Sequence, residues 1–390
     1  MRIVQIAGEY PPLQGGLGDY TRELSRALAA LGHELHVLTK MSPGLPQHEE
    51  AAGITIHRLS PRWGWHTLGQ LNAFIAEHQP DIINLQYQTA AYQMHGAINL
   101  VPRFVGKRAP VVVTFHDLRA PYLFPKAGPL RRRSILELAH SAAAVIVTNE
   151  EDCAMLALAS LSNVSMIPIG SNIAPPHSMA ALSTDFDRLA WLQAHSYPRS
   201  DYVVGYFGFM NASKGGAVLV RGLAALRALG VDANLLLIGG LTGESDHTNI
   251  AYANEVLALA EQLGVRDHIL QTGFVNDHQV SEALTACDCM ALPYIDGASF
   301  RRGTLMAALA HGRAIVTTMP RVPLPEMRDG ENLLLVPPQD ETALANTIAR
   351  VLRDAPLRQR LEAGSAALSR LFSWDGIATK TARVYTSLLP

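Results

Sequence analysis

The sequence predicts an α/β protein of two domains, each with a parallel β-sheet covered by helices. Short apolar runs alternate with longer segments of helical periodicity, which is typical of repeated βα units. This alternation stops and then restarts after residue 200. A chain of 390 residues is too long for one ordinary compact core and fits two. With 48% hydrophobic and 17% charged residues, the composition suits well-buried sheets and excludes a disordered chain.

The individual strands are predicted from apolar runs that are each followed by helical or loop material. In the first half these runs are RIVQIA, HELHVLT, ITIHRL, DIINLQ, PVVVTFH and AAVIVTN. In the second half they are YVVGYFG, NLLLIGG, HILQTGF, CMALPY, RAIVTT and NLLLVP. Parallel strands need a crossover between them, so the intervening segments are expected to be helices.

The same rhythm predicts the domain boundaries. Residues 1–172 form the first domain and residues 201–372 the second. Residues 173–200 are expected to be a linker, because prolines, serines and one short helical stretch replace the strand pattern. Residues 373–390 have helical spacing and either close the second domain or cross back to the first. Since ligands gather at the carboxyl ends of parallel strands, the cleft between two facing sheets is the expected site.

Composition and charge exclude several classes of protein. The formal net charge is −2, so no basic field exists to hold nucleic acid. The start of the chain runs directly into a strand, and no later segment has 18 uninterrupted apolar residues, so a cytoplasmic protein without a membrane span is expected. Cys153, Cys287 and Cys289 match neither a disulfide framework nor a zinc site, and are expected to be reduced thiols.

Two glycine-rich loops are candidate phosphate sites. The first offers Gly15, Gly16 and Gly18 immediately before a predicted helix, whose first N–H groups have no partner within the helix. Such glycines can also serve only the turn. The second loop, NASKGG, places Lys214 at a predicted helix start, where a cation opposes the helix dipole unless an anion offsets it. The alternative is an ordinary solvated lysine.

A third candidate lies in residues 295–312. Here Ser299, Arg301, Arg302 and Gly303 precede an apolar helix. Two guanidinium groups, one hydroxyl and the free N–H groups of a helix start together form an anion site. The alternative is that the arginines pair with surface carboxylates.

One histidine has a special position in the pattern. His116 follows PVVVTF, so it should emerge at the carboxyl end of a buried strand. There an imidazole can exchange hydrogen bonds with a sugar hydroxyl. A structural histidine is the alternative.

Two further charged runs receive other interpretations. The acidic pair of Asp185 and Asp187 lies in the linker, where a solvated turn is expected, so no metal site is predicted. Arg131, Arg132 and Arg133 form a basic run that could contact an anionic lipid or a phosphorylated acceptor. A solvated helix start is the alternative for this run.

Taken together, these residues resemble the retaining glycosyltransferases of family 4, which have the GT-B fold of two Rossmann-like domains facing each other across a cleft. The resemblance covers nearly the whole chain, and the order of its segments is more specific than any one of them. The segments that carry it are GEYPPLQGGLGDYTRELSRALAALGHELHVLT, TFHD, PIGSNI, NASKGG, TGFVNDHQVSEAL, residues 295–312, PEMRDGENLLLVPP and FSWDGIATKTARVY.

The resemblance implies roles for several residues. The Gly15 to Gly18 loop would abut the donor phosphates, His116 would lie beside the transferred sugar, and Lys214 would neutralise the diphosphate. The final helix would cross back to the first domain. Family members bind the nucleotide mainly through the second domain and need no metal and no further cofactor.

The sequence departs from the family pattern at three positions. Many members have an arginine where this chain has Phe209, and two glutamates where it has Ser299 and Ala307. The second of these glutamates typically binds the ribose diol, so ribose recognition is left unassigned. Arg301 or Arg302 is expected to supply the positive charge that is missing at Phe209.

The resulting expectation is a metal-independent, retaining transferase that uses a UDP- or GDP-sugar. The acceptor would be a polysaccharide, a lipid-linked molecule or a small molecule, and the basic run could contact the inner membrane face. The first alternative is a non-catalytic nucleotide-sugar-binding protein, which the three departures favour. An epimerase or a phosphorylase of the same fold is the second, and the sequence shows the residue pattern of neither.

Overall fold

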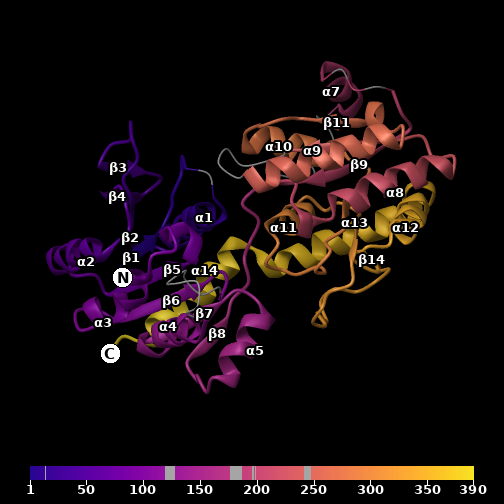
Figure 1. The fold of residues 1–390 in the computed structure, drawn as a ribbon. Coiled ribbons are helices and arrows are strands. Elements are labelled where there is room, and N and C mark those ends of the chain that lie inside the picture. Colours follow the sequence, from indigo (N-terminus) through magenta and orange to yellow (C-terminus); the bar gives the residue numbers. More distant parts are fainter. Residues whose placement is uncertain (14, 119–127, 176–186, 196, 198, 241–246) are drawn as a thin grey trace. The chain divides into compact units, whose positions relative to one another are not determined.

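The computed structural model describes residues 1–13, 15–118, 128–175, 187–195, 197, 199–240 and 247–390. They fall into two compact units, Met1–Asn172 with Ser373–Pro390, and Ile173–Phe372. Each unit is a largely parallel sheet covered by helices (Figure 1). The predicted α/β fold class is confirmed, and every apolar run named above contains a strand.

The first unit carries an eight-stranded sheet of order β3-β4-β2-β1-β5-β6-β7-β8. Its strands are β1 (Arg2–Ala7), β2 (Glu34–Lys40), β3 (His48–Ala51), β4 (Ile54–Ser60), β5 (Ile82–Tyr87), β6 (Val111–Phe115), β7 (Ala144–Val147) and β8 (Val164–Met166). Its helices are α1 (Gly16–Ala30), α2 (Trp65–His78), α3 (Val101–Val105), α4 (Gly128–Ser141), α5 (Glu150–Leu158) and α14 (Trp374–Thr386), with 3₁₀ turns at Thr89–Tyr92 and Gly96–Leu100. All strand pairs are parallel except β3 with β4.

Two apolar clusters cover the faces of this sheet. One contains side chains from α2, α3, α4 and α5, and the other contains side chains from α1 and α14. In α1, Leu17, Leu24 and Leu28 are buried at helical spacing, so this helix presents one apolar stripe to the sheet. The sheet is therefore buried on both faces, which explains its nearly continuous apolar strands.

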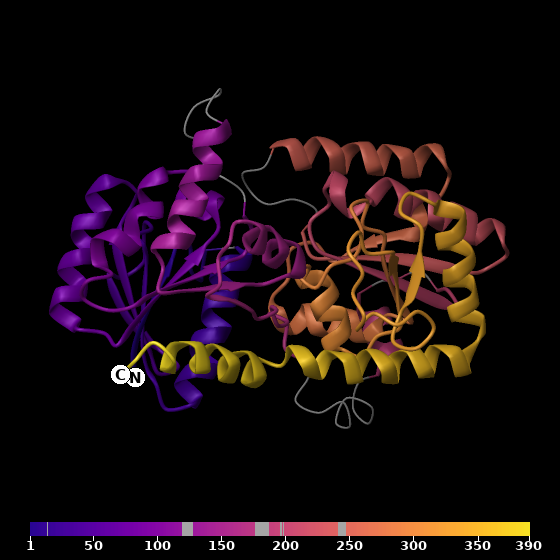
Figure 2. The same cartoon turned by 90° about the horizontal axis from the view of Figure 1, so that it is seen from below.

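The C-terminal helix α14 belongs to the first unit. Ser373 caps it by accepting a hydrogen bond from the N–H of Gly376 at 3.3 Å. The indole N–H of Trp374 donates to the backbone oxygen of Ser171 at 2.7 Å, while Ile377 and Tyr385 are buried against the sheet cluster. Figure 2 shows this helix at the end of the chain, running along the first unit.

The second unit carries a six-stranded parallel sheet of order β11-β10-β9-β12-β13-β14. Its strands are β9 (Tyr202–Phe207), β10 (Ala233–Ile238), β11 (Ile269–Gln271), β12 (Cys289–Leu292), β13 (Ile315–Thr318) and β14 (Leu334–Val336). Its helices are α7 (Arg188–Ala194), α8 (Gly216–Ala228), α9 (His247–Gln262), α10 (Asp277–Ala286), α11 (Gly303–Ala310), α12 (Glu341–Arg353) and α13 (Ala355–Ser369). The 3₁₀ turns are Ala212–Lys214, Arg266–His268 and Arg370–Phe372.

The strand orders identify where ligands can enter each unit. Successive strands are added toward one edge of the sheet and then toward the other. This change in strand order falls between β1 and β5 in the first unit and between β9 and β12 in the second, where the paired strands remain parallel. At such a point the two following loops separate, and a crevice forms at the carboxyl ends of the strands. The loops after β9 and β12 contain Lys214 and Arg302, and His116 follows β6, the neighbour of β5.

The structure differs from the expectation in two places. Strands β3 and β8 were not predicted, because HEEA is polar and VSM is only three residues long. The described part of the expected linker at 173–200 groups with the second unit. Its helix α7 packs on α10, and Arg188 forms an ion pair with Asp288 at 2.6 Å. Asp187 caps this helix, and Asp185 lies outside the described residues.

Candidate active site

The loop after β9 holds Lys214 against a glycine. Gly208 has φ of +106°, and a Cβ built there would lie 2.9 Å from Lys214 Nζ and 2.6 Å from the Thr304 methyl group. Any side chain at this position would therefore collide with the ammonium group and with helix α11. The position needs glycine for both backbone conformation and space.

Hydrogen bonds within the loop fix the backbone of Lys214. Asn211 accepts from the N–H of Lys214 at 3.2 Å and from the hydroxyl of Ser213 at 2.9 Å. Gly215 then adopts a left-handed conformation, with φ of +74°, and a Cβ there would lie 2.0 Å from the backbone oxygen of Pro293. This contact brings the β9 loop against the β12 loop. The N–H of Ile295 donates to the backbone oxygen of Ser213 at 2.9 Å and ties the two together.

Lys214 is a partly buried cation without a counter-ion among the residues that the structure describes. No carboxylate of those residues lies within ion-pair distance of its Nζ. Burial lowers the pKa of Lys214 to about 8, and the nearby Arg302 guanidinium adds to this effect. A buried charge normally has a partner, so this geometry favours an anion that binds from outside the chain.

Arg302 is held differently from Lys214. It caps the start of α11, and its guanidinium forms an ion pair with Asp296 and lies 4.8 Å from the centre of the Tyr294 ring. Only 15% of its side chain is exposed. The Tyr294 hydroxyl shares a hydrogen bond with Thr304 at 2.7 Å. Asp296 therefore neutralises Arg302 before any ligand binds.

The other residues predicted for this loop lie beside Arg302. The Ser299 hydroxyl accepts from the N–H of Arg301 at 3.4 Å, and the Ser299 backbone oxygen accepts from the N–H of Arg302 at 3.0 Å. Gly303 is exposed and begins α11, with open space around its Cα. Among the described side chains, Arg301 forms no ion pair, so it is the arginine that remains available.

The three departures from the family pattern have different environments. The Phe209 side chain is 38% exposed near the start of the loop after β9, so it adds apolar surface there. Ala307 is fully buried within α11. Its backbone oxygen contacts His311 Nδ1 at 2.7 Å, and the burial of His311 lowers its pKa to about 4. Ser299 is intermediate in exposure and lies in the loop.

In the first unit, the glycine loop before α1 contains its own anion. Glu9 is a partly buried carboxylate, and a Cβ on Gly15 would lie 1.8 Å from its Oε1. Burial raises the pKa of Glu9, while Lys40 and the N–H groups of Leu17 and Gly18 act in the opposite direction. The start of α1 is thus satisfied by Glu9, a residue that the sequence interpretation missed. Gly16 begins the helix with open space around it.

Close packing explains Gly18 in the same loop. A Cβ there would lie 3.0 Å from the Cα of Tyr10, so glycine lets α1 approach the loop after β1. Two residues later, Tyr20 meets the His116 ring edge to face at 4.5 Å. The glycine loop and His116 are therefore brought together through α1.

His116 is a neutral, partly buried imidazole. Its Nε2 lies 2.9 Å from the side-chain oxygen of Gln86 on β5. Burial lowers the pKa of His116 to about 3, so it carries no charge near neutral pH. It can exchange hydrogen bonds with a hydroxyl, and it does not act as a cation for phosphate. Gln86 was not predicted from the sequence as a site residue. Gln86 lies one residue before the end of β5, which pairs with β6, the strand that His116 follows.

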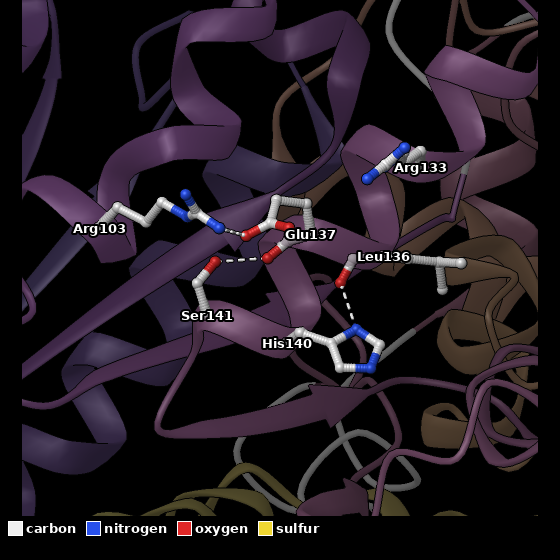
Figure 3. A pocket seen from close by; sticks show the side chains of 6 residues that line it. All are labelled: Arg103, Arg133, Leu136, Glu137, His140 and Ser141. Atoms are coloured by element: carbon white, nitrogen blue, oxygen red, sulfur yellow. Dashed lines mark hydrogen bonds and ion pairs between the residues drawn. The ribbon is translucent and has the colours of Figure 1, made fainter.

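The basic run on α4 borders a separate cavity of about 500 Å³ in the first unit (Figure 3). Its lining residues are Arg103, Arg133, Leu136, Glu137, His140 and Ser141. Figure 3 shows Arg103 of α3 joined to Glu137 of α4. Arg132 and Arg133 are exposed, whereas Arg131 is partly buried, so the three arginines do not form one solvated face.

The described residues offer no reactive thiol at Cys287 or Cys289, no cluster of metal ligands and no membrane-spanning helix. Burial raises the pKa of the Cys287 thiol to about 12 and that of Cys289 also, so both are inert thiols at neutral pH. Within the described part of the chain, no group of three His, Cys, Asp or Glu side chains could hold a metal ion. None of the described helices is long and apolar enough to cross a bilayer.

Comparisons with known proteins agree with this architecture. A family model described as "Glycosyl transferase 4-like domain" matches residues 15–164. A second, "Glycosyl transferases group 1", matches residues 201–354. Together the two models cover most of both units.

Relatives match over nearly their whole length. A phosphatidyl-myo-inositol mannosyltransferase of Mycobacterium leprae is 25% identical over 100% of this chain and 97% of its own. A D-inositol 3-phosphate glycosyltransferase of Xylanimonas cellulosilytica is 28% identical over 95% and 91%. The Anabaena HepE structure in complex with UDP is 20% identical, covers 100% of both chains and has a TM-score of 0.74. The chain belongs to the group 1 glycosyltransferases of family 4, and its fold is GT-B.

Proposed function

We propose that this protein is a retaining glycosyltransferase that takes a hexosyl group from a UDP- or GDP-sugar without a metal ion. The acceptor would be a polysaccharide, a lipid-linked molecule or a small molecule on the cytoplasmic side of a membrane. The proposal depends mainly on Lys214, a partly desolvated ammonium group in the loop after β9 that has no carboxylate partner among the described residues. A diphosphate is the counter-ion that this position fits.

The proposed chemistry depends on charge that grows during the reaction. As the bond between the anomeric carbon and the phosphate oxygen breaks, its electron pair moves to the leaving diphosphate. Lys214 and Arg301 would stabilise that charge, together with the first N–H groups of α8 and α11. Each such contact would lower the barrier by about 2 to 4 kcal/mol. The acceptor hydroxyl attacks from the same face and gives its proton to the leaving phosphate.

Neutral His116 would have a different role. An uncharged imidazole can bind a sugar hydroxyl and does not attract the diphosphate away from Lys214. In this proposal, Glu9 keeps the α1 helix start closed to a second phosphate, and the Gly15 to Gly18 loop only abuts the donor.

The relatives favour particular substrates. HepE has been solved with UDP and with UDP-glucose, and two relatives are named for phosphatidyl-myo-inositol and inositol 3-phosphate acceptors. An acceptor with a phosphate group would fit the exposed Arg132 and Arg133 of the first unit. The non-catalytic alternative is favoured by Phe209 and Ala307, which lack the usual polar groups.

Titration with UDP, GDP and ADP in the presence of a metal chelator tests the proposal. We expect one nucleotide to bind, and Lys214→Ala to weaken it about 10- to 100-fold, since a hydrogen bond to a charged group contributes about 1.5 to 3 kcal/mol. Affinity should fall as pH rises above 8, because Lys214 then loses its proton. Lys380→Ala, which changes a lysine of the other unit, is the matched control.

Donor hydrolysis and transfer then separate the alternatives. Slow release of sugar that depends on Lys214 supports the transferase. Tight binding with no turnover in any acceptor mixture supports the binding protein instead. No nucleotide binding at all would rule out both.

The arginines of the β12 loop give a second prediction. Arg301→Ala should weaken nucleotide binding about tenfold, because its charge is not neutralised within the described chain. Asp296 already pairs with Arg302, so Arg302→Ala should mainly lower the melting temperature by leaving the partly exposed Asp296 carboxylate without its partner. Isothermal titration and thermal unfolding distinguish these effects. Equal affinities in Arg301→Ala and the parent protein would contradict the assignment.

We also propose that α3 and α4 contact the inner membrane face at its anionic lipids. Exposed Arg103 and Lys107 on and after α3 adjoin exposed Arg132 and Arg133 on α4. Exposed apolar side chains also lie on these helices, at Phe104 and Leu130. Basic and apolar side chains in one region suit a lipid surface.

Binding to lipid vesicles tests this contact. Arg132→Glu with Arg133→Glu should weaken binding to vesicles that contain anionic lipid at least tenfold, since each basic residue contributes about 1 kcal/mol. Arg350→Glu with Arg360→Glu, which makes the same charge change at exposed positions of the second unit, should have a smaller effect. Sedimentation with vesicles measures both. Equal losses in the two double variants would indicate a general charge effect and contradict a local site.

A further inference from the structure

A buried chain of hydrogen bonds runs from His116 to the C-terminal helix. His116 Nε2 contacts the Gln86 side-chain oxygen at 2.9 Å, and the Gln86 amide nitrogen donates to the Gln5 side-chain oxygen at 2.8 Å. The Gln5 amide nitrogen then donates to the Tyr385 hydroxyl at 3.4 Å. Three separate parts of the sequence therefore meet in one polar line: strand β1, strands β5 and β6, and helix α14.

The far end of this line is fixed by a second pair of contacts. The Asn84 amide nitrogen donates to the Tyr385 hydroxyl at 2.5 Å, and the Asn84 side-chain oxygen accepts from the Thr114 hydroxyl at 3.0 Å. Asn84 therefore presents its nitrogen, not its oxygen, to the tyrosine. The Tyr385 oxygen receives hydrogen bonds from both amides.

These polar side chains share one face of an otherwise apolar sheet. Gln5 pairs in register with Asn84, and Gln86 with Thr114. Gln5, Asn84 and Gln86 are fully buried, and Tyr385 is fully buried as well. Buried amides are tolerated only when they are hydrogen-bonded, and apolar side chains would stabilise this core at least as well. A role beyond packing is therefore needed to explain why three buried amides and the Tyr385 hydroxyl form one network that reaches His116.

The direction of these hydrogen bonds determines which tautomer of the His116 imidazole is present. Gln86 directs its oxygen to His116 and its nitrogen away from it. An amide oxygen only accepts hydrogen bonds, so the proton of neutral His116 must be on Nε2. Nδ1 is then an acceptor, and among the described residues it has no hydrogen-bond partner.

We propose that Gln86, Gln5 and Tyr385 are positioning residues that hold His116 as the Nε2–H tautomer, leaving Nδ1 to accept a hydrogen bond from a substrate hydroxyl. This inference rests on the proposed function for the role of Nδ1, although the tautomer itself can be observed without any substrate. It assigns α14 a role in the site through the Tyr385 hydroxyl. The opposite chain direction, in which Tyr385 donates to Gln5 and Gln86 donates to His116, would place the proton on Nδ1.

Nitrogen NMR of the histidine rings tests the assignment. The full chain is labelled with ¹⁵N in histidine, and the His116→Asn variant identifies the His116 signals by their loss. We expect one protonated Nε2 and one unprotonated Nδ1 in the parent protein. Tyr385→Phe and Gln86→Leu should both move the two signals toward averaged values, because nothing then fixes the tautomer.

Two further variants control for structural damage. Gln86→Glu keeps an oxygen acceptor for Nε2–H, so it should retain the parent tautomer. Tyr87→Phe removes another buried hydroxyl of the same unit. The Tyr87 hydroxyl accepts from Thr89 and is not part of the hydrogen-bond line to Tyr385, so this variant should leave the His116 signals unchanged. Thermal unfolding identifies any variant that does not fold. In that case the spectra of the parent protein and of Gln86→Glu still show which His116 nitrogen carries the proton.

The outcomes are distinct from those for the proposed function. A parent protein with the proton on Nδ1 or with averaged signals overturns the inference, as does a Tyr385→Phe spectrum equal to that of the parent. In transfer assays, Tyr385→Phe should lower kcat about tenfold and leave the KM for the donor unchanged. If Tyr385→Phe lowers kcat but leaves the His116 tautomer unchanged, the inference is also overturned. If Tyr385→Phe changes the tautomer but the parent protein shows no transfer activity, only the proposed function is overturned.

Discussion

The site in the second unit depends on one partly buried ammonium group that the described part of the chain does not neutralise. Gly208 makes room for Lys214, Asn211 fixes its backbone, and Gly215 brings the β12 loop against it. Burial has already lowered the pKa of Lys214 to about 8, so the charged form is held at a free-energy cost in the empty protein. An arriving diphosphate removes that cost. The fold thus prepares the site for a dianion before the donor binds.

The two units contribute opposite kinds of chemistry. In the second unit, Lys214 and Arg301 provide charge at helix starts, where the helix dipole also favours an anion. In the first unit, Glu9 closes the corresponding helix start and His116 stays neutral. One unit is therefore suited to the phosphates, and the other to hydrogen bonds with hydroxyl groups. This division explains why two loops of similar composition, both rich in glycine, do not have the same role.

The fold could largely be predicted from the sequence, because its strands are buried on both faces and read as apolar runs. The exceptions are β3, which is polar and lies at a sheet edge, and the three-residue strand β8. The linker with its short helix also groups with the second unit, where Arg188 pairs with Asp288. No local pattern reveals such a long-range ion pair. Within the site, Lys214 and His116 could be found because each follows a recognisable strand end.

The partners of these residues could not be predicted from the sequence. Asp296 neutralises Arg302, and Glu9 occupies the α1 helix start, because the fold brings together side chains from separate positions along the chain. The link from His116 to Tyr385 spans most of the chain and depends on which strands are neighbours. Strand periodicity shows that Gln5 and Gln86 are buried, and only the sheet order shows that they meet.

Proton uptake on nucleotide binding is the most direct test of whether Lys214 pairs with a bound diphosphate. At pH 8 about half of the Lys214 side chains should be protonated in the free protein, and a bound diphosphate should protonate the rest. Titrating UDP or GDP in buffers of different ionisation enthalpy should therefore show an uptake of about half a proton for each nucleotide bound. Lys214→Gln should abolish that uptake. Nucleotide binding with the same proton uptake in Lys214→Gln would contradict the account.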